Sequence, residues 1–340
     1  MLEIDGSIGE GGGQVLRTAL SVACVLGKPV RITNIRAGRE TPGLRAQHLT
    51  VCKLLAEITG GKLSGASLGS SEITFSPGKI SGGGYSFDIG TAGSCTLLLQ
   101  AALPVLLCAP VPCSLRIKGG THVRGAPTYE YFSEVFLPAI GRFGAKCESK
   151  LVSHGFYPKG GGEIIVEAHP SVLSGCELAD GKGKSARYSI ISSSLPESVA
   201  AREEKTVKET LGKEFELQGK SETAASPCAG NAITVWSGTH GGCAIGERGK
   251  PAEQVAKGAC EDFLSGTGKG GAAGKSGAAG GSAVDRHLAD QLLVYAALAS
   301  GRSAFSSSEF TSHLKTNAET LRRMTGRNII LGEEGRIEVF

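Results

Sequence analysis

The sequence predicts an α/β (α+β) protein whose large domain is built from repeated β-α-β-α-β-β units, with a smaller α/β domain inserted into it. Three observations support this prediction. Strand patterns alternate with helical patterns along most of the chain, glycine turns at Gly9 and Gly90 open two similar units, and residues from about 180 to 280 break the repeat. We therefore expect a large domain of residues 1–180 and 281–340 and an inserted domain of residues 181–280.

Turn and cap signals delimit the first unit. Gly27 and Gly60 follow apolar helical patterns and are typical helix ends. Thr41 and Pro42 have the residue types of an N-cap and a first helical turn, so we expect the second helix to begin there. The expected order is strand, helix, strand, helix, strand, strand, at residues 2–5, 13–26, 29–35, 41–59, 62–66 and 72–76.

The second unit is expected to follow the same order, and a third copy is expected near the end of the chain. The second comprises residues 85–89, 95–107, 114–118, 129–143, 146–152 and 162–168. The third starts at 283–285 and continues through 288–298, 303–305, 318–324, 328–331 and 336–339. The insert has its own strand and helix signals, at 232–236 and 252–264, and leaves through a Gly/Ala/Ser/Lys-rich segment at 265–282 that should be mobile.

Composition gives weaker information about function. The chain has 340 residues and a net charge of +4, which is too small to indicate nucleic-acid binding by itself. Between residues 11 and 56, however, seven basic residues accompany a single acid, Glu40. This local excess favours an anionic ligand, and a solvated basic face is the alternative. The seven are Arg17, Lys28, Arg31, Arg36, Arg39, Arg45 and Lys53.

Cysteine usage and hydropathy indicate the compartment. The ten cysteines form no CxxC pair and show no zinc-site spacing. We expect reduced thiols in a cytoplasmic protein. No signal peptide and no apolar run long enough to span a bilayer is found, so no membrane partner is expected, whereas a homo-oligomer is compatible with the sequence.

The opening glycine turn carries the first candidate functional residues. Glycines let a ligand approach the backbone closely and leave N–H groups free to bind it. Glu10 lies in the turn, and Gln14 and Arg17 follow at a spacing that places them on one helical face. A carboxylate suited to a metal and a guanidinium suited to a phosphate point to nucleotide or phosphate chemistry.

A basic loop at 36–48 is the second candidate. Arginine binds two phosphate oxygens at once, and cations at a helix N-terminus are unfavourable unless an anion is bound there. Arg36 and Arg39 have no obvious acidic partner nearby in the sequence. A solvated surface loop is the alternative interpretation.

Other segments are ambiguous when taken singly. The Gly90–Ser94 turn followed by Gln100 could bind a ligand or could simply pack a helix end. The carboxylate of Asp290 could be a ligand contact or ordinary compensation of the helix dipole. His313, near a strand-to-helix junction, could be a nucleophile or general base, although a lone histidine is more often structural.

Taken together, six segments strongly resemble the RNA 3′-terminal phosphate cyclase family, in the same order and over almost the whole chain outside the insert. The family fold consists of repeated β-α-β-α-β-β units with an inserted smaller α/β domain, as expected above. The segments are GEGGGQ-x-x-R from Gly9, RAGR-x-x-PG-x-x-x-QH from Arg36, GTAGSCT-x-x-LQ from Gly90, HGFYP-x-GGG from His154, H-LADQL from His287 and SHL-x-TN from Ser312.

The resemblance implies an ATP-dependent reaction on RNA that ends in a 3′-phosphate. His313 matches the nucleophile that attacks the α-phosphate of ATP to give a histidyl-AMP. AMP then passes to the RNA 3′-phosphate, and the adjacent 2′-hydroxyl closes a 2′,3′-cyclic phosphate. Glu10 matches a carboxylate that binds a divalent metal, Mg or Mn.

The other implied roles concern the two substrates. Residues matching the surroundings of the metal and phosphates are Gln14, Arg17, Arg36, Arg39 and Gln47. Residues matching the nucleotide site are Gln100, Pro127, His287, Leu288, Ala289, Asp290 and Gln291. The family often has a tyrosine at the position of His287, and an imidazole can also stack on adenine.

Two other functions remain open at this point. A non-catalytic, cyclase-like protein of ribosome assembly would lack the nucleophilic histidine, whereas this chain retains His313. An enolpyruvyl transferase would share the repeated units and bind phosphate-rich ligands but would need no covalent nucleotide. If the cyclase mechanism holds, Glu10 and Arg17 must lie on the same side of the molecule as His313, because metal, triphosphate and nucleophile must meet.

Overall fold

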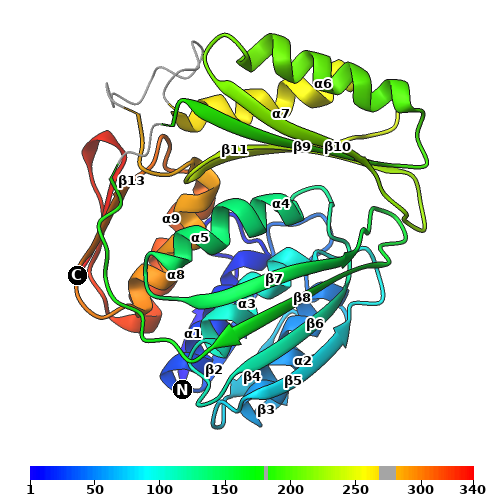
Figure 1. Cartoon of the computed structure of the whole chain (residues 1–340). Coiled ribbons are helices and arrows are strands. Elements are labelled where there is room, and N and C mark those ends of the chain that lie inside the picture. Colours follow the sequence, from blue (N-terminus) through cyan, green and yellow to red (C-terminus); the bar gives the residue numbers. More distant parts are fainter. Residues whose placement is uncertain (180–182, 268–280) are drawn as a thin grey trace.

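Two four-stranded sheets of identical topology confirm the predicted fold class (Figure 1). This computed structural model describes residues 1–179, 183–267 and 281–340. The strands are β1 (Leu2–Asp5), β2 (Val30–Thr33), β3 (Lys62–Ser64), β4 (Ile73–Ser76), β5 (Gly83–Asp88), β6 (Cys113–Gly119), β7 (Lys146–Ser153) and β8 (Gly162–His169). Their orders are β1-β2-β4-β3 and β5-β6-β8-β7. In each sheet the first pair is parallel and the other pairs are antiparallel, as a β-α-β-α-β-β unit requires.

The crossover helices of the two units have different regularity. The first unit contains α1 (Gly13–Leu26) and α2 (Ala46–Thr59), each ended by a glycine in the left-handed conformation, Gly27 and Gly60. The second contains α3 (Cys95–Leu106), whose N-cap is Ser94, and then a helix interrupted by a π-helical turn. Its segments are α4 (Tyr129–Tyr131), the π turn (Phe132–Phe136) and α5 (Leu137–Gly141).

The second helix begins five residues later than expected, which corrects the assignment of Thr41 as its N-cap. Gly43 has φ +79°, which no right-handed helix allows. Its N–H donates to the carbonyl of Ile35, and the Arg36 guanidinium donates to the carbonyls of Thr41 and Gly43 at 2.7 Å. These bonds satisfy the backbone as a loop, so α2 starts only at Ala46, with Arg45 at the N-cap.

A third, incomplete unit follows the insert. It consists of α8 (Arg286–Leu298), β13 (Ser303–Ser306), α9 (Ser312–Thr325), β14 (Ile329–Leu331) and β15 (Arg336–Val339). The strand order β13-β15-β14 matches the last three strands of the other units. The strand expected at 283–285 is reduced to an isolated bridge between Val284 and Ser307. Helix α9 begins at Ser312 rather than at 318, because the Thr311 hydroxyl caps it by accepting from the Leu314 N–H at 3.1 Å.

The inserted segment forms its own sheet and core. Its elements are β9 (Ser185–Ser193), α6 (Glu197–Leu211), β10 (Glu216–Thr223), β11 (Gly230–Ser237), β12 (His240–Ile245) and α7 (Ala252–Thr267). The strand order is β10-β9-β11-β12, and a separate cluster of buried residues includes Val207, Ile233 and Phe263. The expected insert boundaries near 180 and 280, and most of the exit segment expected at 265–282, lie outside the described residues, although α7 extends to Thr267 and Ser282 is buried.

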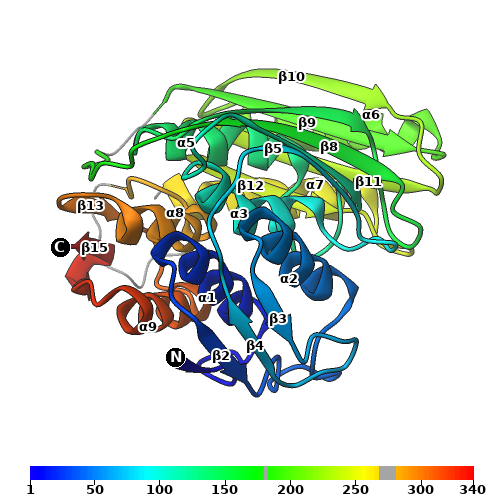
Figure 2. The same ribbon diagram turned by 90° about the horizontal axis from the view of Figure 1, so that it is seen from below.

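The helices of the three units pack together and leave the insert on one side. Helix α1 packs against α2, α3 and α9, and α9 packs against α8, around buried side chains such as Leu20, Leu99 and Leu292. Figure 2 shows α1, α2 and α9 from below, and Figure 1 shows α6 and α7 on the far side of the insert sheet's strands, above α4 and α8. Within the described ranges, no helix has the length and apolar character needed to cross a membrane.

Candidate active site

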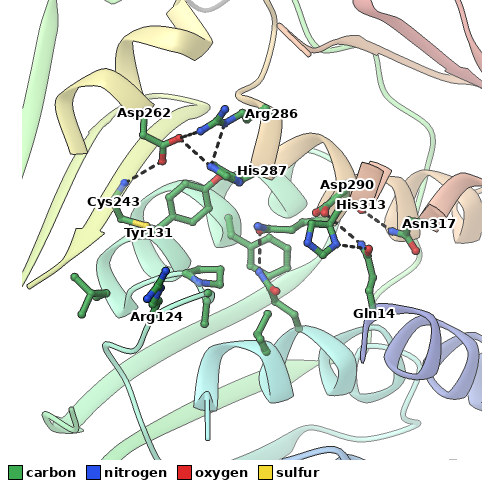
Figure 3. A pocket seen from close by; sticks show the side chains of 18 of the residues that line it. Gln14, Arg124, Tyr131, Cys243, Asp262, Arg286, His287, Asp290, His313 and Asn317 are labelled. Atoms are coloured by element: carbon green, nitrogen blue, oxygen red, sulfur yellow. Dashed lines mark hydrogen bonds and ion pairs between the residues drawn. The ribbon is translucent and has the colours of Figure 1, made fainter. Parts of the chain in front are cut away.

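A cavity of about 780 Å³ lies where the repeated units meet the insert. Helices α1, α3, α8 and α9 contribute most of the residues singled out by sequence, and β12 and α7 of the insert contribute others (Figure 3). Segments that are far apart in the sequence therefore form one site. The sequence-predicted residues that line this cavity are Gln14, Arg17, Gln100, Pro127, His287, Asp290, Gln291 and His313.

His313 lies at one end of the cavity, in the first turn of α9. Its Nε2 lies 3.2 Å from Glu10 Oε2, and its Nδ1 lies 2.8 Å from Gln14 Oε1. The Glu10 carboxylate also accepts from the hydroxyl of Ser312 and from Arg39 Nη2, at 3.3 Å for the latter. The expectation that Glu10 and His313 lie on the same side of the molecule is confirmed.

The hydrogen bonds of Gln14 determine which His313 nitrogen carries the proton in the neutral ring. Gln14 Nε2 donates to Asp290 Oδ2 at 3.2 Å, which leaves the amide oxygen directed at His313 Nδ1. An amide oxygen only accepts, so Nδ1 is the donor and Nε2 keeps the free lone pair. Burial lowers the pKa of His313, as do the nearby charges of Arg17 and Arg39, whereas Glu10 raises it; the net direction is down.

Basic side chains surround the glycine turn. Arg17 is poorly solvated, and burial lowers its pKa to about 10 despite the nearby charge of Asp290. Arg39, which the sequence left without an acidic partner, pairs with Glu10, and that expectation is therefore wrong. His48 lies beneath these arginines, 5% exposed, and burial followed by the charge of Arg17 lowers its pKa to about 3.

His287 lies at the other end of the cavity and is held by the insert. Its Nε2 lies 2.9 Å from Oδ1 of Asp262 on α7, which also accepts from Arg286 Nη2 at 2.7 Å. Burial lowers the pKa of His287, but the hydrogen bond and charge of Asp262 and the charge of Asp285 outweigh it and raise the pKa to about 9. The ring is therefore cationic near neutral pH.

The N-terminus of α8 is fixed by a fully buried carboxylate. Asp285 Oδ1 accepts from the N–H groups of His287 and Leu288 at 2.8 Å, and its Oδ2 accepts from the Gly241 N–H of the insert at 2.8 Å. The Tyr131 hydroxyl donates to the same carboxylate at 2.8 and 2.9 Å. This network positions His287 by anchoring the helix on which it lies.

Asp290 and Gln291 connect α8 to α1 and α3. Burial raises the pKa of Asp290 to about 7, although Gln14 and Arg17 oppose this shift. Its main-chain oxygen accepts from Asn317 Nδ2 at 2.7 Å, and Gln100 Nε2 donates to Gln291 Oε1 at 2.8 Å. Thr96 Oγ1 donates to the Pro127 carbonyl at 2.8 Å and so fixes the loop that carries the proline ring.

The structure does not bring all the predicted residues to the cavity. Leu288 and Ala289 are fully buried in the hydrophobic core, so this part of α8 could meet a nucleotide only through its main chain, and their place in the nucleotide site stays a prediction. On α8 their side chains face the core, whereas His287 and Asp290, three residues apart, lie on the side towards the cavity. The Arg36 guanidinium closes the 41–43 loop, and the Gln47 amide oxygen accepts from the Ser94 N–H at 3.1 Å.

Sequence reasoning missed every cavity residue that the insert supplies. Asp262, Cys243 and Glu247 line the cavity beside Lys250, and only the helical pattern of 252–264 hinted at an element there. The apolar periodicity of 252–264 predicts the buried face of α7, which includes Phe263. It does not predict that Asp262 pairs with Arg286 and His287 of α8. In the sequence, only membership of the basic loop at 36–48 marks His48.

Metal-binding capacity at this site is modest. Among the residues that the structure describes, no group of three or more histidine, cysteine or carboxylate side chains could hold a metal ion. The Glu10 carboxylate with substrate oxygens suits Mg²⁺, which commonly binds one or two carboxylates plus phosphates. All ten cysteines are free, as expected.

Comparison with known proteins identifies the family. The RNA 3′-terminal phosphate cyclase family model matches residues 8–331. Among curated relatives, the RNA 3′-terminal phosphate cyclase of Archaeoglobus fulgidus is 40% identical over 330 residues, covering 96% of each chain. That of Methanosarcina barkeri is 42% identical over 320 residues, covering 93% of this chain and 92% of the relative.

A distant structural match adds nothing to this assignment. The enolpyruvyl transferase NikO from Streptomyces tendae matches with a TM-score of 0.28 and 15% identity, covering 49% of this chain and 33% of that chain. The family model and the curated relatives, by contrast, extend over the repeated units and the insert alike. The chain belongs to the RNA 3′-terminal phosphate cyclase family and is an enzyme.

Proposed function

We propose that this enzyme converts an RNA 3′-terminal phosphate to a 2′,3′-cyclic phosphate at the expense of ATP, through a histidyl-AMP and an RNA-adenylate. The observation that carries the proposal is the arrangement of His313, with a proton directed to Gln14 from Nδ1 and a lone pair on Nε2 at the end of the cavity. A neutral imidazole nitrogen is an effective nucleophile for phosphorus.

In the first step the Nε2 lone pair attacks the α-phosphorus of ATP. The N–P bond forms as the bond to the diphosphate oxygen breaks, so AMP becomes attached to His313 and diphosphate leaves. Arg17 and Arg39 carry positive charge to this end of the site and can stabilise the triphosphate. Gln14, held by Asp290, orients the ring and keeps the proton on Nδ1.

The next two steps move AMP onto the RNA and release it. An oxygen of the RNA 3′-phosphate attacks the phosphorus of histidyl-AMP, and the P–N bond breaks. The 2′-hydroxyl then attacks the RNA 3′-phosphorus, its proton is lost to a base or water, and AMP leaves as the ring closes. The two adenylated intermediates divide one difficult reaction into easier displacements, because each displacement has an activated leaving group.

Mg²⁺ or Mn²⁺ at Glu10 would neutralise phosphate charge during these displacements. The residues present fit such an ion, because Glu10 offers a carboxylate oxygen beside the nucleophile and the substrate phosphates supply further oxygen ligands. Ser312 and Arg39 are alternative donors to the same carboxylate. The site can therefore hold Glu10 in place when His313 Nε2 carries no proton.

The nucleotide is proposed to occupy the cavity between Pro127 and His287, with its base near α8 and α3. Both residues line the cavity, and Gln100, Asp290 and Gln291 supply polar groups there. The ten free thiols accord with a reducing, cytoplasmic compartment. RNA and ATP are the partners of this proposal, and no membrane is required.

Two alternatives are disfavoured by specific observations. A non-catalytic ribosome-assembly relative has no need for a nucleophile, whereas His313 here is oriented by Gln14 and Asp290. An enolpyruvyl transferase is disfavoured because the family model describes RNA 3′-terminal phosphate cyclases over residues 8–331.

The test is incubation with α-labelled ATP and Mg²⁺ or Mn²⁺, followed by denaturation. The cyclase mechanism predicts one labelled AMP covalently bound per active chain, released on addition of RNA with a 3′-phosphate but not a 3′-hydroxyl. A cyclic product should appear in the same reaction. Absence of covalent label with intact ATP binding would favour the non-catalytic alternative.

A further inference from the structure

The contact between the insert and α8 suggests a function for the inserted segment. Asp262 is on α7, in the insert, and its carboxylate binds two neighbouring side chains of α8, Arg286 at 2.7 Å and His287 at 2.9 Å. Its second oxygen accepts from the Cys243 N–H of β12 at 3.3 Å. Figure 3 shows this cluster on the cavity wall, away from His313 and Gln14.

Asp262 is well placed to fix a side chain, because it is itself held on several sides. Only 12% of its side chain is exposed, against 45% for His287. Burial raises the pKa of Asp262, but the hydrogen bonds and charges of His287 and Arg286 outweigh this and lower it. The carboxylate is therefore ionised and holds the His287 ring through Nε2, while the half-exposed side chain of His287 lines the cavity.

We propose that Asp262 is a positioning residue that holds His287 as an imidazolium against the nucleobase, so that the cavity selects purines through cation–π stacking. This inference rests on the proposed function, since it places a nucleoside triphosphate in the same cavity. The attraction between a cation and a π system strengthens as the pair is desolvated, and the larger rings of purines offer more overlap than those of pyrimidines. The insert thus contributes to nucleotide selection through one carboxylate.

Other charged or titratable groups face His287 and must be considered. The Asp285 carboxylate raises the pKa of His287, and Arg286 lowers it. Asp290 has a pKa raised to about 7 and is itself influenced by His287. The charged groups that act on His287 or on which it acts are Asp262 on α7, Asp285 at the N-cap of α8, Arg286 and Asp290 on α8, and His313 on α9. Cys243 on β12 and Tyr131 on α4 donate to the Asp262 and Asp285 carboxylates, respectively.

The decisive variant is Asp262→Asn, which keeps an oxygen for the hydrogen bonds and removes the charge. The pKa of His287 should fall, so that the ring is neutral at pH 8 and partly protonated at pH 6. We expect the KM for ATP in AMP labelling to rise roughly fivefold at pH 8 and less at pH 6, with little change in kcat. At pH 8 the ratio of kcat/KM for ATP to kcat/KM for CTP should be smaller for Asp262→Asn than for the wild type.

A double-mutant cycle separates Asp262 from other titrating groups, Asp290 in particular. His287→Phe keeps a stacking ring but has no charge, so adding Asp262→Asn to it should leave KM unchanged at both pH values. The matched control is Glu253→Gln, another acid of α7, which pairs with Arg202 away from the cavity at 3.5 Å and should leave KM unchanged.

Equilibrium ATP binding to the His313→Ala background makes the inference independent of turnover. If the wild type forms no covalent AMP but binding still depends on Asp262 and pH as described, the proposed function fails and the positioning role stands. The inference is overturned if Asp262→Asn weakens ATP and CTP equally, if its effect is the same at pH 6 and 8, or if it persists in full with Phe at 287. Melting temperatures of all variants identify any general loss of folding.

Discussion

The two ends of the cavity each pair a histidine with a carboxylate, yet the two imidazoles have opposite pKa shifts. At the α9 end, Glu10 lies 3.2 Å from His313, and burial with Arg17 and Arg39 lowers the pKa of the histidine. At the α8 end, Asp262 lies 2.9 Å from His287, whose pKa is raised to about 9. The wider charge environment, rather than the carboxylate contact alone, decides the protonation state.

The two histidines have opposite pKa shifts because different parts of the chain supply the charged groups that surround each histidine–carboxylate pair. Around His313 the glycine turn and basic loop of the first unit add arginines. Around His287 the insert and the start of α8 add the carboxylates of Asp262 and Asp285. One cavity therefore holds an imidazole with a lowered pKa at one end and a cationic imidazole at the other.

The largest expected effect is at the α9 end. His313→Ala should reduce covalent AMP labelling to background, because no other side chain replaces the nucleophile, while ATP binding persists through the remaining groups of the cavity. The variant should still close the ring on RNA that is supplied already adenylated. The control is His169→Ala, an exposed histidine at the end of β8, which should label normally. Labelling of His313→Ala at the wild-type level would remove the basis of the comparison.

Arg39→Ala comes next, because it removes a positive charge from the α9 end without disturbing the core. Loss of a hydrogen bond to a charged phosphate should lower kcat/KM roughly ten- to hundredfold. The side chain is 45% exposed, so the melting temperature should change little. Arg31→Ala, which removes an exposed arginine paired with Glu3 and Glu72, should leave kcat/KM unchanged. A normal rate for Arg39→Ala would identify the loop as a solvated basic face.

At the α8 end, the raised pKa of His287 has a consequence for stability. Its folded pKa of about 9 exceeds the ordinary 6.5, so the Asp262–His287 pairing stabilises the fold fully below pH 6.5 and loses this contribution as the pH rises towards 9. Asp262→Asn should therefore lower the melting temperature more at pH 6 than at pH 10. An equal decrease at both values would show that the charge pairing is unimportant for stability.

The smallest effect concerns Asp290, which lies between the two ends. Burial raises its pKa to about 7 from 3.8, so the folded protein loses stability from this group as the pH rises from about 4 through 7. Asp290→Asn removes this penalty and should raise the melting temperature at pH 8.5 relative to wild type, with a smaller difference at pH 5.5. Gln14 and Arg17 already offset part of the cost, which keeps the effect small.

The α9 end could be predicted from sequence because its residues belong to ordered motifs. Glu10 and His313 are far apart in the chain, but each occurs in a motif that the family resemblance assigns to the same site, and the two side chains lie 3.2 Å apart. The repeated units were likewise predictable, since strand and helix periodicities and the glycine turns recur. The late start of α2 was not, because Gly43 and the Arg36 hydrogen bonds outweigh the local capping preference of Thr41.

The α8 end could be predicted only in part. His287 and Asp290 lie in a motif, but their charge states depend on Asp262 and on burial, which are properties of tertiary packing. No local pattern marks Asp262, since an acid on an amphipathic helix usually faces solvent. The burial of the Leu288 and Ala289 side chains in the core is likewise a property of tertiary packing that motif membership does not reveal.

The central claim is that His313 is the residue that carries AMP, and peptide mapping after labelling tests it most directly. The protein is labelled with α-labelled ATP, digested at alkaline pH and analysed by mass spectrometry. We expect AMP on the peptide that contains His313, through a bond that is labile in acid and stable in base, as a phosphoramidate is. AMP found on a lysine, or on any histidine other than His313, would contradict the account.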